Sequence, residues 1–77
     1  MINKNYNNTL SKLGFKYDDT VHNGGSLYTH WFSHKENNSM ILIEDFGSEY
    51  DYFYNPNYKT LGYHRFNSFK ELLNFIK

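Results

Sequence analysis

The chain of 77 residues has no cysteine, only one proline and no long apolar run. Without cysteine, neither a disulfide nor a thiolate zinc site can form, so stability must come from packing. No apolar stretch approaches the ~18 residues of a transmembrane helix, and the N-terminus lacks the apolar segment of a secretory signal. We therefore expect a single domain over residues 1–77, located in the cytoplasm, or in the host cytoplasm if a phage encodes it.

Charge is balanced overall but unevenly distributed along the chain. Residues 36–58 carry five carboxylates and no lysine or arginine, whereas residues 59–77 carry four basic residues and one acid. A protein that binds duplex nucleic acid normally has a broadly basic surface, and this chain does not. The distribution allows one negative and one positive surface. Aromatic residues make up 21% of the chain and are expected to replace aliphatic residues in the core.

Both ends of the chain are predicted to be helical. Apolar residues follow one helix face over residues 3–13: Ile2, Tyr6, Leu10 and Leu13. Gly14 comes directly after this face, where a helix commonly ends in a left-handed residue. Near the other end, Ser68 and Glu71 have the spacing of a capping box, which starts a helix. Its buried side is predicted to carry Phe69, Leu72, Leu73 and Ile76.

The segment between the helices predicts an antiparallel sheet of three to five strands, and thus an α+β fold. Asn23-Gly24-Gly25 is the strongest turn signal, because these residues tolerate positive φ. Further turns are predicted over residues 35–38 and at Gly47-Ser48, and Pro56 ends the alternating pattern. The expected strands span residues 15–22, 27–34, 40–46, 50–55 and, as a fifth, 60–65.

The predicted register decides which residues share a face of the sheet. A turn over residues 35–38 places Phe32 on the same face as Ile41 and Ile43. It places Trp31 on the opposite face together with Leu42. If both helices cover one face, the other must expose a patch that contains either Trp31 or Phe32.

The histidines give no metal or catalytic pattern. His30 and His34 lie four residues apart, roughly 13 Å along a strand, which is too far for one metal ion. His30 could approach Asp45 or Glu44 across a hairpin. A small hydrolase or nuclease centred on His30 or His34 is a third, weaker hypothesis. We expect no enzyme activity, no cofactor and no bound metal, because no nucleophile or Ca²⁺-loop spacing accompanies the carboxylates.

The acidic segment beside alternating tyrosines favours recognition of another protein. Closely spaced carboxylates complement a basic groove, and Tyr and Trp are frequent interface anchors. The alternative for the tyrosines is that they are core residues. The predicted partner-binding residues are Glu44, Asp45, Glu49, Tyr50, Asp51, Tyr52, Tyr54 and Trp31. We expect a protein-binding module of phage or mobile-element type that inhibits a host nucleic-acid enzyme, as anti-CRISPR or anti-restriction proteins do, with a homodimer as a further expectation.

The second hypothesis is an RNA-binding or single-stranded nucleic-acid-binding protein. Aromatic strands stack bases, and basic residues guide the backbone. The residues for this role are Tyr28, Trp31, Phe32, Lys35, Lys59, Arg65 and Lys70. The acidic segment counts against it, because phosphate contacts supply much of the affinity.

One stretch resembles a known family. The pattern Leu10-x-x-Leu13-Gly14-Phe15, then Gly24-Gly25-Ser26, then His34-Lys35 before an apolar strand, is similar to the start of HicA-type toxins. The similarity covers residues 9–43 and implies an α-β-β-β-α order with a double-stranded-RNA-binding-like fold. In that family a catalytic histidine follows the Gly-Ser pair. Leu27 stands there in this chain, so the resemblance implies the order of elements and not RNA cleavage.

Overall fold

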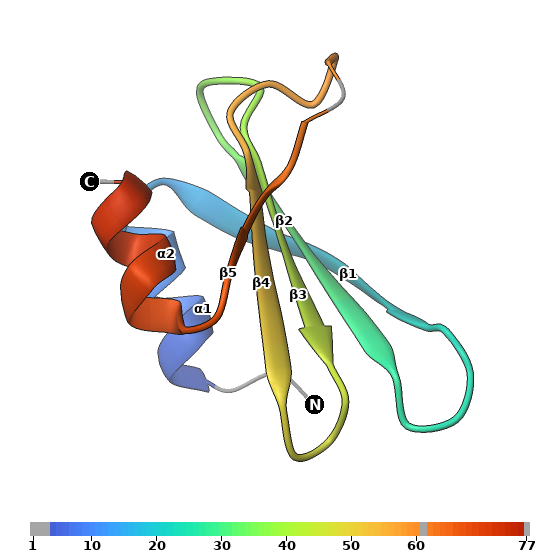
Figure 1. Ribbon diagram of the computed structural model, residues 1–77. Coiled ribbons are helices and arrows are strands. Elements are labelled where there is room, and N and C mark those ends of the chain that lie inside the picture. The colour runs from blue at the N-terminus through green and yellow to red at the C-terminus, as the bar shows by residue number, and fades with distance from the viewer. Residues whose placement is uncertain (1–3, 61, 77) are drawn as a thin grey trace.

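The computed structural model describes residues 4–60 and 62–76, and these form two helices and five strands (Figure 1). In chain order the elements are α1 (Lys4–Lys12), β1 (Phe15–His22), β2 (Tyr28–His34), β3 (Met40–Asp45), β4 (Tyr50–Asn55), β5 (His64–Phe66) and α2 (Phe69–Ile76). The predicted α+β fold, with a helix at each end and an antiparallel sheet between, is confirmed. None of the described helices is long and apolar enough to span a membrane.

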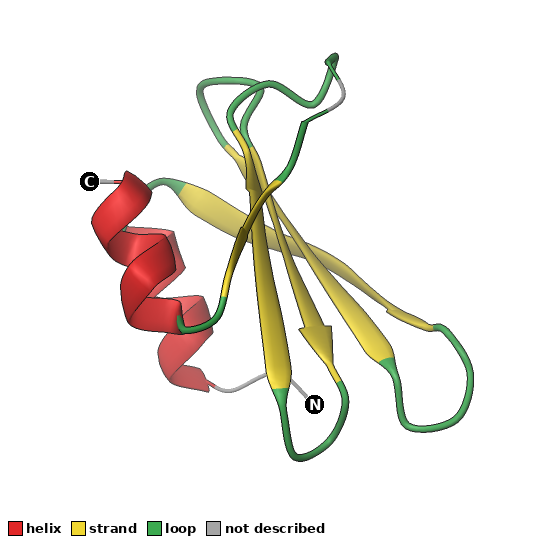
Figure 2. Cartoon of the chain, in the orientation of Figure 1, coloured by secondary structure: helices red, strands yellow, loops and turns green. Residues whose placement is uncertain are grey.

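The five strands form one sheet in the order β1-β2-β3-β4-β5, and every neighbouring pair is antiparallel. The β1–β2 and β3–β4 turns lie together at one end of the sheet, and the β2–β3 and β4–β5 connections lie at the other end (Figure 2). The predicted register is correct, since Phe32 pairs with Ile41 and Trp31 pairs with Leu42. The β1–β2 register shifts between Tyr17 and Asp19, which marks a bulge in the outer strand β1.

Both helices lie on the same face of the sheet (Figure 1). The ring of Tyr6 in α1 lies 4.2 Å from the ring of Phe69 in α2, so the two helices also meet each other. The buried apolar side chains between helices and sheet are Leu10, Phe15, Phe32, Ile41, Ile43, Tyr52 and Leu72. We call this covered side of the sheet the helix face and the other side the open face.

The end of α1 requires glycine. Gly14 has φ of 95°, a conformation that L-residues with a side chain rarely adopt, and its N–H donates to the Ser11 carbonyl at 3.1 Å. A Cβ there would lie 2.5 Å from Nε2 of His34. That nitrogen donates to the carbonyl of Leu13 at 3.2 Å. The close approach therefore fixes the end of α1 against the end of β2.

The start of α2 has the predicted cap. The N–H of Glu71 donates to the Ser68 hydroxyl at 3.2 Å, and the Glu71 carboxylate accepts from the N–H of Asn67 at 3.1 Å. Side-chain oxygens therefore accept hydrogen bonds from backbone N–H groups at the start of the helix, as the spacing of Ser68 and Glu71 predicts.

The fifth strand was placed incorrectly by the sequence pattern. β5 spans His64–Phe66 rather than residues 60–65, and it pairs with β4 from Tyr52 to Tyr54. Thr60 belongs to a turn instead, because its N–H and its hydroxyl both donate to the Asn57 carbonyl, at 3.0 and 2.9 Å. The predicted helical residues Ile2 and Asn3 and the predicted strand residue Leu61 lie outside the described residues.

Candidate protein-binding surface

One row of paired residues crosses the middle of the open face. Each member is the direct partner of the next on the neighbouring strand, so all five side chains point to the same side of the sheet. This central row consists, from β1 to β5, of Asp19, Trp31, Leu42, Phe53 and Arg65. Its three apolar members are half-buried although no described helix covers them. The open face therefore presents an apolar strip between an acid and a base.

Carboxylates gather on the side of the central row that leads to the β3–β4 turn. Glu44 lies directly opposite Asp51, and Glu49 is exposed in the turn itself. We call these three residues the acidic end. Asp51 forms an ion pair with Arg65, with 2.9 Å between Oδ1 and Nη2, whereas the carboxylate of Glu44 forms no hydrogen bond or ion pair with another described residue. Like charges directly opposite each other destabilise a strand pair, and here Arg65 neutralises only one of the two carboxylates.

The opposite end of the open face is hollowed and carries charges of both signs. A shallow depression of about 540 Å³ lies over the β2–β3 connection, and Lys16, Asp18, Lys35 and Tyr58 contribute to its lining. Lys16 forms an ion pair with Asp18 at 3.9 Å. The N–H of Tyr58 donates to the Asn38 carbonyl at 2.8 Å, which ties the β4–β5 connection to this end.

The structure divides the predicted partner-binding residues between the two faces. Trp31, Glu44 and Asp51 lie on the open face, with Glu49 at its edge. The remaining predicted residues, Asp45, Tyr50, Tyr52 and Tyr54, lie on the helix face. Four residues separate Asp45 from its partner Tyr50. Because this number is even, the odd positions of β3 and the even positions of β4 lie on the same face. The length of this loop could therefore have shown, from the sequence, that the predicted residues lie on two different faces.

The tyrosines of β4 have interior contacts. Tyr52 is buried, and its hydroxyl lies 2.6 Å from the hydroxyl of Tyr6, whose ring also contacts Tyr50 edge-on. Burial raises the pKa of Tyr52, and the hydrogen bond to Tyr6 raises it further. Burial also raises the pKa of Tyr50, and the Asp45 carboxylate adds to this shift. The tyrosines of β4 therefore pack in or against the core, at positions that aliphatic residues occupy in other small domains.

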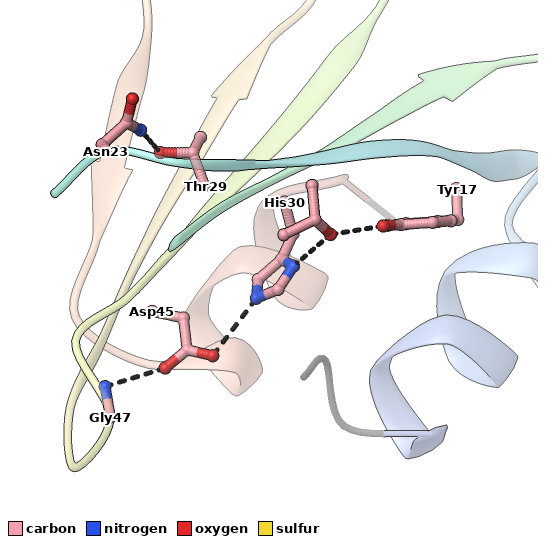
Figure 3. Close-up of polar contacts among 7 residues, drawn as sticks. Tyr17, Asn23, Thr29, His30, Asp45 and Gly47 are labelled. Carbon is pink, nitrogen blue, oxygen red and sulfur yellow. Dashed lines mark hydrogen bonds and ion pairs between the residues drawn. The ribbon is translucent and has the colours of Figure 1, made fainter. Parts of the chain in front are cut away.

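A polar chain runs from the surface into the interior of the helix face (Figure 3). The hydroxyl of Tyr17, which is 39% exposed, bonds the Thr20 hydroxyl, and this hydroxyl lies 2.8 Å from Nδ1 of His30. Nε2 of His30 lies 3.2 Å from Oδ2 of Asp45, whose Oδ1 accepts from the Gly47 N–H at 2.8 Å. Because a carboxylate only accepts, Nε2 of His30 donates this hydrogen bond to Asp45.

The surroundings of Asp45 favour its ionised form. Burial alone raises its pKa, but the hydrogen bond from Gly47 and the hydrogen bond and charge of His30 together outweigh burial and lower the pKa below the usual value. The order hydroxyl, imidazole, carboxylate is that of a nucleophile and its base. Here His30 is only 1% exposed and the hydroxyl of Thr20 is already bonded by Tyr17. This chain of hydrogen bonds therefore links β1, β2 and β3.

Metal ligands are not gathered in the described part of the chain, where no three side chains of His, Asp or Glu come together. Comparison with protein families, curated proteins and solved structures finds no match to this chain. The sheet also has two more strands than the α-β-β-β-α order of HicA-type toxins. A functional surface is therefore inferred from the geometry of the open face alone.

Proposed function

We propose that the protein is a non-enzymatic protein-binding module whose open face docks onto a basic surface of a partner protein. The observation that supports this proposal is the carboxylate of Glu44, which lies directly opposite Asp51 and is not neutralised as Asp51 is by Arg65. It lies beside the half-buried side chains of Trp31, Leu42 and Phe53. A lysine or arginine from a partner would pair with the Glu44 carboxylate. The apolar strip would supply the water-excluding contact next to them.

The partner that best fits this surface is an enzyme that processes nucleic acid. Such enzymes have basic grooves for phosphates, and the acidic end offers three carboxylates in place of phosphates. Occupying the groove would exclude the substrate, so the expected effect is inhibition. Inhibitors of this type, encoded by phages and mobile elements against CRISPR or restriction enzymes, act in the cytoplasm of the host cell. The acidic end and the adjacent apolar strip support this finer assignment.

Charge reversal at the acidic end tests the proposal. The double variant Glu49→Lys/Asp51→Lys is expected to bind its partner more than tenfold more weakly, because two attractive contacts become repulsive. The control Asp18→Lys/Glu36→Lys makes the same change in net charge at residues outside the acidic end. Circular dichroism would first establish that both variants fold. Equal loss in both variants, or unchanged affinity in the first, would contradict a docked acidic end.

The partner can be found by capture on the immobilised protein from lysate, with and without nuclease treatment. The proposed function expects a discrete protein in both arms, and its affinity for wild type and variants is then measured with the purified partner by calorimetry. Capture that disappears after nuclease treatment would contradict the proposal.

Single-stranded nucleic acid is the second candidate partner, because Trp31 and Phe53 both lie on the open face and Phe53 lies beside Arg65. Aromatic rings on a sheet stack bases, and a basic residue attracts the backbone. This candidate expects steep dependence on salt and loss of oligonucleotide binding in Trp31→Ala. Glu44 and Asp51 would repel phosphates on the same surface, which is why the protein partner is preferred.

A further inference from the structure

The central row is complementary to itself when its direction is reversed. Asp19 and Arg65 stand at its two ends, each two strands away from Leu42, while Trp31 and Phe53 stand one strand away on either side. A half-turn about an axis that runs along β3 through Leu42 exchanges the two ends. After this rotation Asp19 faces Arg65, Trp31 faces Phe53, and Leu42 faces its own copy.

We propose that a second copy of this chain occupies the open face, related by this two-fold axis, so that two five-stranded sheets pack face to face. An isologous contact needs a self-complementary patch, and the order acid, aromatic, aliphatic, aromatic, base provides one. Arg65 already pairs with Asp51 of its own chain at 2.9 Å, so in the dimer its guanidinium would be shared between Asp51 and Asp19 of the second copy. The same rotation sets Ser33 opposite Asn55 on the side of the row that leads to the β2–β3 connection. Aligned packing of two sheets about 10 Å apart is a common arrangement of antiparallel sheets.

The axis also determines where the two acidic ends meet. Because the axis is parallel to β3, both β3–β4 turns lie at the same end of the dimer, and the Glu44 side chains of the two copies approach each other. Two acidic ends then form one larger acidic surface, and their repulsion makes the dimer weaker than its apolar contact alone would be. The second copy and the partner of the proposed function would both cover Trp31, Leu42 and Phe53, so they compete for the open face. A bound partner is therefore expected to shift the protein to its monomeric form.

The area of the open face limits the expected affinity of the dimer. Six-residue strands at ~3.3 Å per residue and five strands at ~4.8 Å spacing give a flat area of roughly 400 Å². A stable interface buries about 800 Å² per partner, so a dimer through this face is expected to be weak and transient. Glu44→Gln removes the repulsion at the axis and is expected to tighten the dimer severalfold.

A charge-swap experiment on the full chain tests this geometry. Asp19→Arg and Arg65→Asp each place like charges opposite each other, so each variant alone is expected to dimerise at least tenfold more weakly than wild type. A one-to-one mixture of the two variants restores both opposite-charge pairs and is expected to form a heterodimer of near wild-type strength. Sedimentation velocity over a concentration series measures all three samples. Lys70→Asp, on the exposed surface of α2, is the control for Arg65→Asp, because both change the net charge by the same amount.

The outcomes separate the dimer from the proposed function. A wild-type protein that stays monomeric to millimolar concentration, or a mixture that fails to associate, would overturn the dimer. If such a monomer still lost its partner through Glu49→Lys/Asp51→Lys, the proposed function would stand without the dimer. A dimer whose acidic-end variants bind the partner unchanged would instead overturn the proposed function alone.

Discussion

His30 and Asp45 form a buried pair that fixes the base of the β3–β4 turn. The imidazole of His30 is held from β2, and the carboxylate of Asp45 takes one hydrogen bond from it and another from Gly47 in the turn. Both side chains are almost fully buried. Since Glu44 precedes Asp45 and Glu49 follows Gly47, the buried pair also positions the acidic end.

Acid is expected to destabilise the protein through Asp45. Its pKa is lowered in the folded state, so its contribution to the free energy of unfolding is complete above the unfolded pKa, near 3.9, and is lost as the pH falls through the lower folded value. Urea unfolding between pH 2 and pH 6 would measure this dependence.

The variant Asp45→Asn separates this residue from the other carboxylates. We expect it to lose on the order of 1–3 kcal/mol at pH 6 and to show a flatter acid dependence, because the uncharged amide no longer titrates. Asp18→Asn, at an exposed position, is the control and should leave both quantities nearly unchanged. A pH profile of Asp45→Asn parallel to wild type would show that the acid sensitivity lies elsewhere.

Tyr52→Phe is expected to destabilise the protein by about 1–2 kcal/mol, because the hydroxyl of Tyr6 then loses its partner in a partly buried position. The raised pKa of Tyr52 also means that its stabilising effect is present below the unfolded pKa, near 10, and is lost as the pH rises above it. Wild type should therefore lose stability in alkali more steeply than Tyr52→Phe. Tyr63→Phe, at an exposed position, is the control.

The adjacent residues Trp31 and Phe32 give a matched pair for the two faces. Phe32→Ala opens a cavity in the core and should cost about 3–5 kcal/mol in the free energy of unfolding. Trp31→Ala should cost less, about 1–2 kcal/mol, because the half-buried indole lies on the open face. Unfolding is measured at a low micromolar protein concentration, so that self-association does not contribute to the free energy of unfolding. Equal losses would mean that Trp31 is a core residue rather than a surface one.

Local patterns were sufficient to predict most of the fold. The apolar spacing around Leu10, the turn at Asn23-Gly24-Gly25 and the cap formed by Ser68 and Glu71 each depend on a few neighbouring residues, and the structure contains all three. The fifth strand was misplaced because the turn at Asn57 to Thr60, held by hydrogen bonds to the Asn57 carbonyl, uses residues that also fit a strand.

The candidate site was only partly predictable. Alternation shows which residues share a face, but the face that the helices cover depends on contacts between distant parts of the chain, such as Tyr6 with Tyr52. The expectation that Trp31 or Phe32 would be left on an uncovered face is confirmed for Trp31. The central row emerges only when four strand pairings are known together, since a single shift of register would break it.

The bulge in β1 limits how this protein can assemble. It interrupts one outer edge of the sheet beside the charged residues Lys16 and Asp18, and the other outer strand, β5, is only three residues long. Neither edge offers the long, regular row of backbone groups on which a further chain could add as a strand. Growth into fibres by strand addition is therefore disfavoured at both edges, and a face-to-face association through the open face is complete once two copies have joined.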